Sequence, residues 1–214
     1  MAGELVWLRR QQHQGGYPVQ LTVTDERTLS RWWGIPYFGT LVRFILLIPH
    51  LLVMAVLGLG MYVILLLGWI PILLNGRVPA LQAKWIQETI HRSTRVTGYG
   101  LYLMPGGYPP LGIGEPGPTD LRIDIGDGSI NRWWGIPLFG LMARVVLAIP
   151  HLIVLSIIMV VGVLGVLVLW IPILISGSYP GWALSLYGGL LRYQARVGAY
   201  ILLLPVPYPP FSLK

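Results

Sequence analysis

The sequence predicts an all-α integral membrane protein built as a tandem duplication, with two membrane-embedded helices in each repeat. Three observations support this fold class. The chain of 214 residues is 55% hydrophobic and only 11% charged, whereas a soluble domain has about 25% charged residues. Its apolar runs exceed the ~18 residues that indicate membrane insertion, and its mean hydropathy is +0.68. A stretch of twenty residues also occurs twice.

The repeated stretch occupies residues 31–50 and 132–151, and 13 of its 20 positions are identical between the copies. Both copies begin with Arg-Trp-Trp-Gly-Ile-Pro and end with Ile-Pro-His. Each copy opens a long apolar segment, which predicts that the repeated unit enters the membrane. The predicted organisation is an amino-terminal cytoplasmic segment (1–16), a first membrane repeat (17–113), a linker (114–118) and a second membrane repeat (119–214).

The formal net charge of +7 comes from basic residues that flank the apolar segments, not from basic runs with interleaved aromatic residues. Such flanks are typical of the cytoplasmic side of membrane helices, so nucleic-acid binding is not expected. The chain has no cysteine, which excludes disulfides, thiolate metal sites, iron–sulfur clusters and cysteine nucleophiles. Residues 1–16 hold no apolar stretch resembling a signal peptide, and we expect the amino end to stay in the cytoplasm.

A short strand is predicted at the beginning of each repeat. Apolar and polar residues alternate over residues 17–23 and again over residues 121–125, a period of two that is typical of a half-buried strand. Asp25-Glu26 ends the first of these segments, and Gly126-Asp127-Gly128 forms a turn after the second.

The apolar segment of the first repeat runs from Pro36 to Leu74 and is interrupted only by Arg43 and His50. As one helix it would be ~58 Å long, against a hydrocarbon core of ~30 Å. Two architectures fit this length. Either the chain turns back around Gly58-Leu59-Gly60, or residues 36–48 lie in the interface and residues 50–74 cross once. Basic residues flank both sides of the segment, which favours the hairpin because it places both flanks on one side.

The second copy of the apolar segment spans residues 137–175, so the hairpin arrangement predicts four embedded helices in total. After each segment comes a Gly-x-x-Pro sequence, at 76–79 and 177–180, which predicts a helix end. An amphipathic helix at headgroup level is predicted next, because basic residues flank an apolar stripe there. Each repeat closes with Tyr-Pro-Pro, at 108–110 and 208–210, and we expect this extended tail to pack beside the strand of its own repeat.

Several short motifs follow one another along the chain: Tyr17-Pro18-Val19, Arg31-Trp32, Ile48-Pro49-His50, Gly177-Ser178-Tyr179-Pro180, Leu191-Arg192-Tyr193-Gln194-Ala195-Arg196-Val197 and Tyr208-Pro209-Pro210-Phe211-Ser212-Leu213. In this order they resemble the bacterial membrane family called domain of unknown function 4389. The resemblance covers nearly the whole chain, once per repeat. It implies a membrane architecture and a bacterial setting, and it implies no activity because the family has none established.

Four polar residues inside the apolar segments are candidates for ligand or lipid contact: His50, His151, Arg43 and Arg144. The histidines could ligate a haem or a chlorin pigment through neutral imidazole. The alternative that we favour is a histidine at a helix start whose ring bonds a free carbonyl. The arginines could bind a lipid phosphate or another anion, and we favour the alternative that they snorkel to the headgroups.

Aromatic and basic residues beside the apolar segments are predicted to anchor the chain at the membrane interface, where amphipathic rings and long cations are enriched. These predicted anchors are Trp32, Trp33, Trp133, Trp134, Arg92, Arg95, Arg192 and Arg196.

No nucleophile–base pair, zinc spacing or phosphate-binding glycine loop is present in the sequence, so we predict that the protein is not an enzyme and has neither metal nor cofactor. The leading hypothesis is a non-catalytic accessory or scaffold subunit of a larger bacterial membrane complex, with membrane lipids and other subunits as partners. It would be a multi-pass protein of the cytoplasmic (inner) membrane with both termini in the cytoplasm. The alternatives are a small channel or transporter lined by His50, His151, Arg43 and Arg144, and a subunit that binds haem or pigment.

Overall fold

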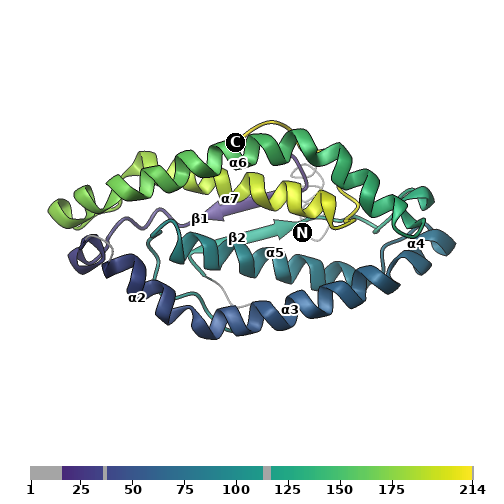
Figure 1. The fold of residues 1–214 in the computed structure, drawn as a ribbon, viewed down its shortest axis with the longest axis horizontal. Coiled ribbons are helices and arrows are strands. Elements are labelled where there is room, and N and C mark those ends of the chain that lie inside the picture. The colour runs from purple at the N-terminus through teal and green to yellow at the C-terminus, as the bar shows by residue number, and fades with distance from the viewer. Residues whose placement is uncertain (1–15, 36–37, 113–116, 214) are drawn as a thin grey trace, which may run out of the picture.

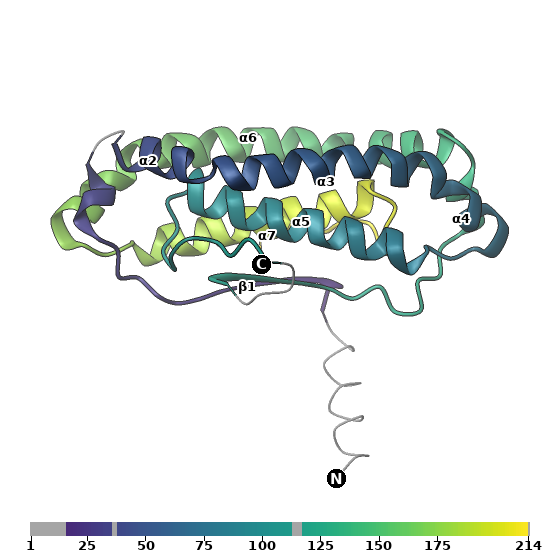
Figure 2. The ribbon, with the colours of Figure 1, turned by 90° about the horizontal axis from the view of Figure 1, so that it is seen from below.

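The computed structural model describes residues 16–35, 38–112 and 117–213, which form three stacked layers (Figures 1 and 2). Two long apolar helical segments form the first layer, two shorter helices form the second, and a two-stranded β-ribbon forms the third. All three layers run along the long axis of the molecule. The predicted cytoplasmic segment 1–16 lies almost wholly outside the described residues, as does most of the predicted linker 114–118.

In the first layer, the helices α2 (Phe38–Leu46), α3 (Ile48–Leu67) and α4 (Trp69–Asn75) follow one another with one residue between them, and their counterpart α6 (Phe139–Ser176) is continuous. The joining residues Leu47 and Gly68 keep right-handed helical dihedrals, so α2–α4 is one interrupted rod. Pro150 and Pro172 lie inside α6. Prolines remove a backbone donor and kink a helix, and both rods are bowed in Figure 1.

The predicted turn at Gly58-Leu59-Gly60 is wrong, because α3 runs through it without a break. The sequence there contains no proline or polar residue that would end a helix. Gly60 instead makes room for Trp85, whose indole ring a Cβ at Gly60 would overlap. The indole Nε1 of Trp85 donates a hydrogen bond to the Leu57 carbonyl at 3.1 Å. Each repeat therefore contains one long apolar helical segment in place of the predicted pair.

Two segments of the described chain, Ile48–Asn75 and Phe139–Ser176, are long and apolar enough to cross a membrane, judged by length and composition. The helices α3 and α6 do not pack on each other, since no Cα atom of one lies within 8 Å of a Cα atom of the other. They contact the second layer instead, α3 on α5 and α6 on α7.

The second layer consists of α5 (Ala80–Gly100) and α7 (Gly181–Ile201), which lie side by side. The predicted Gly-x-x-Pro signals are confirmed as helix ends. Gly76 and Gly177 adopt left-handed dihedrals, with φ of 64° and 68°, which a residue without Cβ reaches at no steric cost. The rings of Tyr102 and Tyr187 stack with centroids 4.5 Å apart where the two repeats meet.

The third layer is formed by β1 (Val19–Val23), which pairs antiparallel with β2 (Thr119–Ile123) and places Leu21 opposite Leu121. Both predicted strands are confirmed, and β2 begins two residues before the predicted segment. Leu21 and Leu121 are buried against the second layer, whereas Thr22 and Arg122 are exposed, as the alternation along a strand requires.

The amino-terminal arm of each repeat packs on the other repeat. β1 lies on α7 and β2 lies on α5 (Figure 1). The short 3-10 helices η1 (Arg31–Gly34) and η2 (Arg132–Gly135) pack on α6 and α4, respectively. Matching hydrogen bonds join Leu29 N to the Gly177 carbonyl at 3.0 Å and Ile130 N to the Gly76 carbonyl at 2.9 Å.

This exchange corrects the expectation that each tail packs beside the strand of its own repeat. Arg192 donates both to the carbonyl of Leu213, in the tail of the second repeat, at 2.8 Å and to that of Leu21, in β1, at 3.1 Å. The tail of the second repeat therefore lies beside the strand of the first. Local sequence patterns carry no information about which of two similar strands a tail will meet.

The exchanged contact leaves no space for a methyl group at Gly34 or Gly135. A Cβ at Gly34 would overlap the backbone nitrogen of Leu174, and one at Gly135 would overlap that of Leu73. We expect Gly34→Ala or Gly135→Ala to lower the free energy of unfolding by roughly 1–3 kcal/mol, as overpacking against rigid neighbours does. Thermal unfolding of the purified variants, followed by circular dichroism, measures this loss.

The matched control is Gly58→Ala, since nothing lies within 4 Å of a Cβ built at that helical position. Replacing an interior helical glycine by alanine should stabilise the protein by roughly 0.5–1 kcal/mol. Equal melting temperatures for Gly34→Ala and the control would show that the close approach of η1 to α6 is not a packing constraint.

Candidate functional site

Arg43 of α2 is buried, with 2% of its surface exposed. Its Nη1 donates hydrogen bonds to the carbonyl oxygens of Tyr99 at 2.8 Å and Met104 at 2.9 Å. The guanidinium carbon lies 4.8 Å from the ring centroid of Trp33 and 4.4 Å from that of Tyr99. The cation is thus held between two aromatic faces, which attract it electrostatically, and it bonds carbonyl groups at the carboxyl end of α5.

Arg144 of α6 repeats this arrangement in the second half of the chain. Its Nη1 donates to the carbonyls of Tyr200 at 2.7 Å and Leu204 at 2.8 Å, and its guanidinium lies between the rings of Trp134 and Tyr200. We call each arginine with its two carbonyls and two rings an arginine clamp. The expectation that Arg43 and Arg144 snorkel to the surface is wrong. The last carbonyls of a helix have no helical partner and carry partial negative charge. The guanidinium groups donate hydrogen bonds to carbonyls at this end of α5 and α7.

The two tryptophans of each repeated stretch have different environments. Trp33 and Trp134 are partly buried as walls of the clamps. Trp32 and Trp133 point outward, with 71% and 69% of their surface exposed. The first tryptophan of each pair is therefore the more accessible one for contacts outside the protein.

His50 and His151 are fully buried and contact different tails. His50 Nε2 lies 3.0 Å from the Pro109 carbonyl, a hydrogen bond that requires the ring to be the donor through this atom. His151 Nδ1 lies 2.7 Å from the Tyr193 hydroxyl, and its ring stacks on Phe211 with centroids 3.9 Å apart. The structure does not bring the two histidines together, since α3 and α6 are not in contact.

The arginines of α5 and α7 bind the β-ribbon and the tails. Arg95 Nε donates to the Thr119 carbonyl at 3.1 Å, and Arg196 Nε donates to the Val19 carbonyl at 3.4 Å. Arg92 bonds the Leu111 carbonyl and forms an ion pair with Glu88 at 2.9 Å. Arg92, Arg95 and Arg196 have 5–7% of their surface exposed, so they lie beneath the ribbon and tails and not on an open helix face as the sequence suggested.

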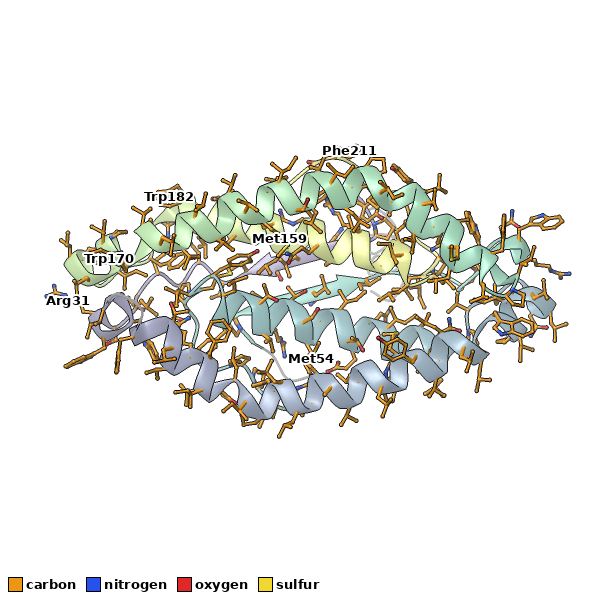
Figure 3. The ribbon with its side chains drawn as sticks, viewed as in Figure 1. Arg31, Met54, Met159, Trp170, Trp182 and Phe211 are labelled. Atoms are coloured by element: carbon orange, nitrogen blue, oxygen red, sulfur yellow. The ribbon has the colours of Figure 1, made fainter. Side chains whose placement is uncertain are left out.

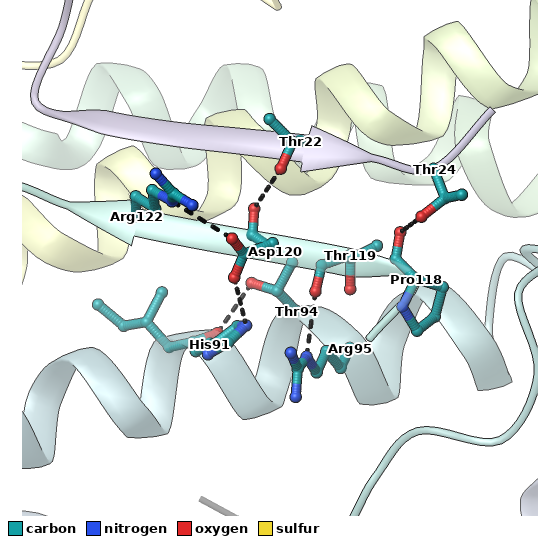
Figure 4. A network of polar contacts seen from close by, with 10 residues as sticks. Thr22, Thr24, His91, Thr94, Arg95, Pro118, Thr119, Asp120 and Arg122 are labelled. Carbon is teal, nitrogen blue, oxygen red and sulfur yellow. Dashed lines mark hydrogen bonds and ion pairs between the residues drawn. The ribbon is translucent and has the colours of Figure 1, made fainter. Parts of the chain in front are cut away.

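Polar contacts between α5 and the ribbon are shown in Figure 4. His91 Nε2 lies 3.8 Å from a carboxylate oxygen of Asp120, which is too far for a hydrogen bond. Burial is the main cause that lowers the pKa of His91, so at neutral pH the ring is uncharged and this contact is not an ion pair. The Asp120 carboxylate also lies 3.4 Å from Arg122 Nε at the surface.

A cavity of about 40 Å³ borders Trp33 of the first clamp, with Leu103 and Trp170 among its other lining residues. A hollow of about 670 Å³ lies beside the ribbon and is lined by Tyr17, Arg122, Asp124 and Ser129, among others. A cavity of about 10 Å³ borders His50. Within the described ranges, no three or more histidine or acidic side chains are grouped so as to hold a metal ion.

A family model described as Domain of unknown function (DUF4389) matches residues 39–109 and again residues 140–212. The two matches confirm the resemblance drawn from the motifs and confirm that the chain carries two tandem copies. Each match begins in the apolar segment and ends in the tail, so each covers the arginine, both carbonyls and the tyrosine of one clamp, while Trp33 and Trp134 precede the matched residues. No curated protein and no solved structure matches the chain.

Replacing a clamp arginine by lysine tests the clamp itself. Lysine keeps the charge but is a compact ammonium, which lacks the planar face that stacks between two rings. We expect Arg43→Lys and Arg144→Lys each to cost roughly 1–3 kcal/mol, the penalty for a poorly satisfied buried group. The melting temperature should fall by roughly 2–12 °C for a chain of this length.

The control is Arg77→Lys, because Arg77 is an exposed arginine outside the clamps. Its melting temperature should match that of the wild type. If the clamp variants and the Arg77 variant melt alike, the positive charge alone, and not the stacking of the guanidinium between two rings, holds the clamp.

Proposed function

This chain belongs to the family described as Domain of unknown function (DUF4389), and from that starting point we propose that it is a non-catalytic accessory or scaffold subunit embedded in a bacterial inner membrane. The observation that carries the proposal is the exposed apolar surface of the first layer. Leu59, Leu66, Ile157 and Ile175 are 60–71% exposed, and Figure 3 shows outward side chains along the whole of both rods. Soluble monomers rarely expose apolar patches larger than a few hundred Å², so lipid or other subunits would cover this surface.

The contacts of the candidate site residues support a structural role. Arg43 and Arg144 are engaged by carbonyl groups of their own chain, and His50 donates to a backbone carbonyl. These engagements weigh against the channel alternative, in which the same side chains would face a pore. The burial of the remaining ring nitrogens, His50 Nδ1 and His151 Nε2, weighs against haem or pigment ligation, because a ligating histidine needs one ring nitrogen that is accessible to a metal.

The position of the charged residues supports a membrane location. Exposed charges of both signs, among them Asp25, Arg27 and Asp124, lie on the arms and the ribbon. Arg43 and Arg144, the charged residues of α2–α4 and α6, are buried, so the exposed surfaces of these helices carry no charged residue. Partners would therefore be lipids and membrane subunits at the first layer, with no cofactor in the chain.

Solubilising native membranes in a mild detergent tests the accessory role. We expect the chain, whose mass is 23.8 kDa, to elute in a complex of larger and defined protein mass with a stoichiometric partner. A photo-reactive benzoylphenylalanine in place of exposed Leu164 should form a covalent adduct with that partner, whereas one in place of Asp127 on the ribbon side should not. A lone monomer that forms only lipid adducts would refute the subunit role.

A further inference from the structure

We infer that the protein lies flat in the membrane, with α2–α4 and α6 parallel to the bilayer plane and immersed among the acyl chains of one leaflet. The inference rests on the membrane embedding proposed above and adds its orientation. In this orientation the second layer lies at headgroup level, and the β-ribbon faces water.

The length of the rods argues against an upright position. The continuous helix α6 has 38 residues and is therefore ~57 Å long at ~1.5 Å per residue. The hydrocarbon core of a bilayer is only ~30 Å thick. Apolar side chains are exposed from one end of α6 to the other, from Phe139 at 58% to Ile175 at 71%, so an upright helix would leave about half of this surface in water.

The position of the ribbon argues more strongly against an upright orientation of the protein. β1 and β2 lie beneath the middle of α5 and α7 and run along the long axis (Figure 2). If the bilayer normal followed that axis, the ribbon would lie in the hydrocarbon core. Exposed Arg122 and Asp124 would then be in lipid, together with the outer strand edges, whose backbone groups have no partner in the ribbon. Charged groups and open sheet edges are not tolerated there.

If the bilayer normal instead runs across the three layers, the rods no longer exceed the thickness of the hydrocarbon core and the ribbon no longer lies inside it. The arginines and histidines within the rods are turned inward, since Arg43, His50, Arg144 and His151 are at most 3% exposed, whereas the phenol ring of Tyr62 in α3 is 76% exposed. The exposed polar Ser156 satisfies its hydroxyl by donating to the Ile153 carbonyl at 2.8 Å. The outer face of the first layer is therefore free of charge over its whole length, while the opposite face carries the exposed acids and arginines of the ribbon.

The thickness of the first layer fits one leaflet. A helix with its side chains is ~10–12 Å across, and half of a hydrocarbon core is ~15 Å. The first layer can thus be immersed without reaching the other leaflet. Trp32 and Trp133 project at the two ends of the molecule, where η1 packs on α6 and η2 packs on α4. In the flat orientation both indoles meet the same membrane–water interface, which is their preferred location.

Depth measurements by electron paramagnetic resonance test the orientation. The chain has no cysteine, so single variants Leu41→Cys, Leu52→Cys, Leu59→Cys and Leu66→Cys each accept one nitroxide. These leucines are 61–70% exposed and lie within an arc of about 40° around an ideal helix. Reconstituted in vesicles of phosphatidylethanolamine and phosphatidylglycerol, all four labels should show one common depth from their relative accessibility to oxygen and to a nickel chelate.

An upright helix gives a different profile. Leu41 and Leu66 would then be ~37 Å apart along the membrane normal, with Leu52 and Leu59 deep and the outer two at or beyond the interfaces. That gradient would overturn the inference. Labels shielded from both oxygen and the chelate would overturn it too, because protein and not lipid would cover the face. The water-exposed control is Thr22→Cys on β1, which should be fully accessible to the chelate.

The outcomes separate this inference from the proposed function. A depth gradient with a stoichiometric partner would reject the flat orientation and leave the accessory role intact. A common depth without any partner would reject the accessory role and leave the flat orientation intact. Four labels open to water would reject the membrane embedding on which both rest.

Discussion

The arginine clamp is the interaction on which the rest of the fold depends. It fixes the amino-terminal part of each apolar rod to the carboxyl end of the helix that follows it, through Arg43 in one repeat and Arg144 in the other. The rods contain no acidic residue, so carbonyl dipoles and aromatic faces are the partners available to each buried cation. Hydrogen bonds from a charged donor are about twice as strong as neutral ones, and they are stronger still away from water.

The repeated stretch combines the clamp with the exchange of arms. Within one copy, Trp33 packs on Arg43 of its own repeat while the neighbouring Gly34 packs on the backbone of Leu174 in the other. The positions that make these contacts are identical in both copies. Phe44 is replaced by Val145 where the side chain is exposed. In the interior of the first repeat, the large side chain of Leu47 lies against Gly100. The second repeat has small Ala148 at the position of Leu47 and large Ile201 at the position of Gly100, so the large and small residues have changed places.

Local patterns were enough to predict the duplication, both strands, the helix ends at Gly76 and Gly177, and the amphipathic helices after them. The hairpin was predicted wrongly because the length of an apolar segment indicates how much apolar surface must be shielded from water. It does not indicate whether the helix continues or turns back. The glycines at 58 and 60 resemble a turn in the sequence, and only the distant Trp85 reveals that Gly60 makes room for a ring. Spacing likewise could not show the partners of Arg43, since the carbonyls it binds belong to residues 99 and 104.

The exchange of arms also determines when the chain can finish folding. Leu29 bonds to Gly177, 148 residues further along, and a ribosome adds ~5–20 residues per second. The first arm therefore waits on the order of 10 s for its partner, while the first apolar rod has already been synthesised. For the first part of that interval, until β2 has been synthesised about 100 residues after β1, β1 is an unpaired strand edge, the kind of surface that associates with other chains. Nascent copies on one messenger would thus be able to pair their arms with each other before their own second halves emerge.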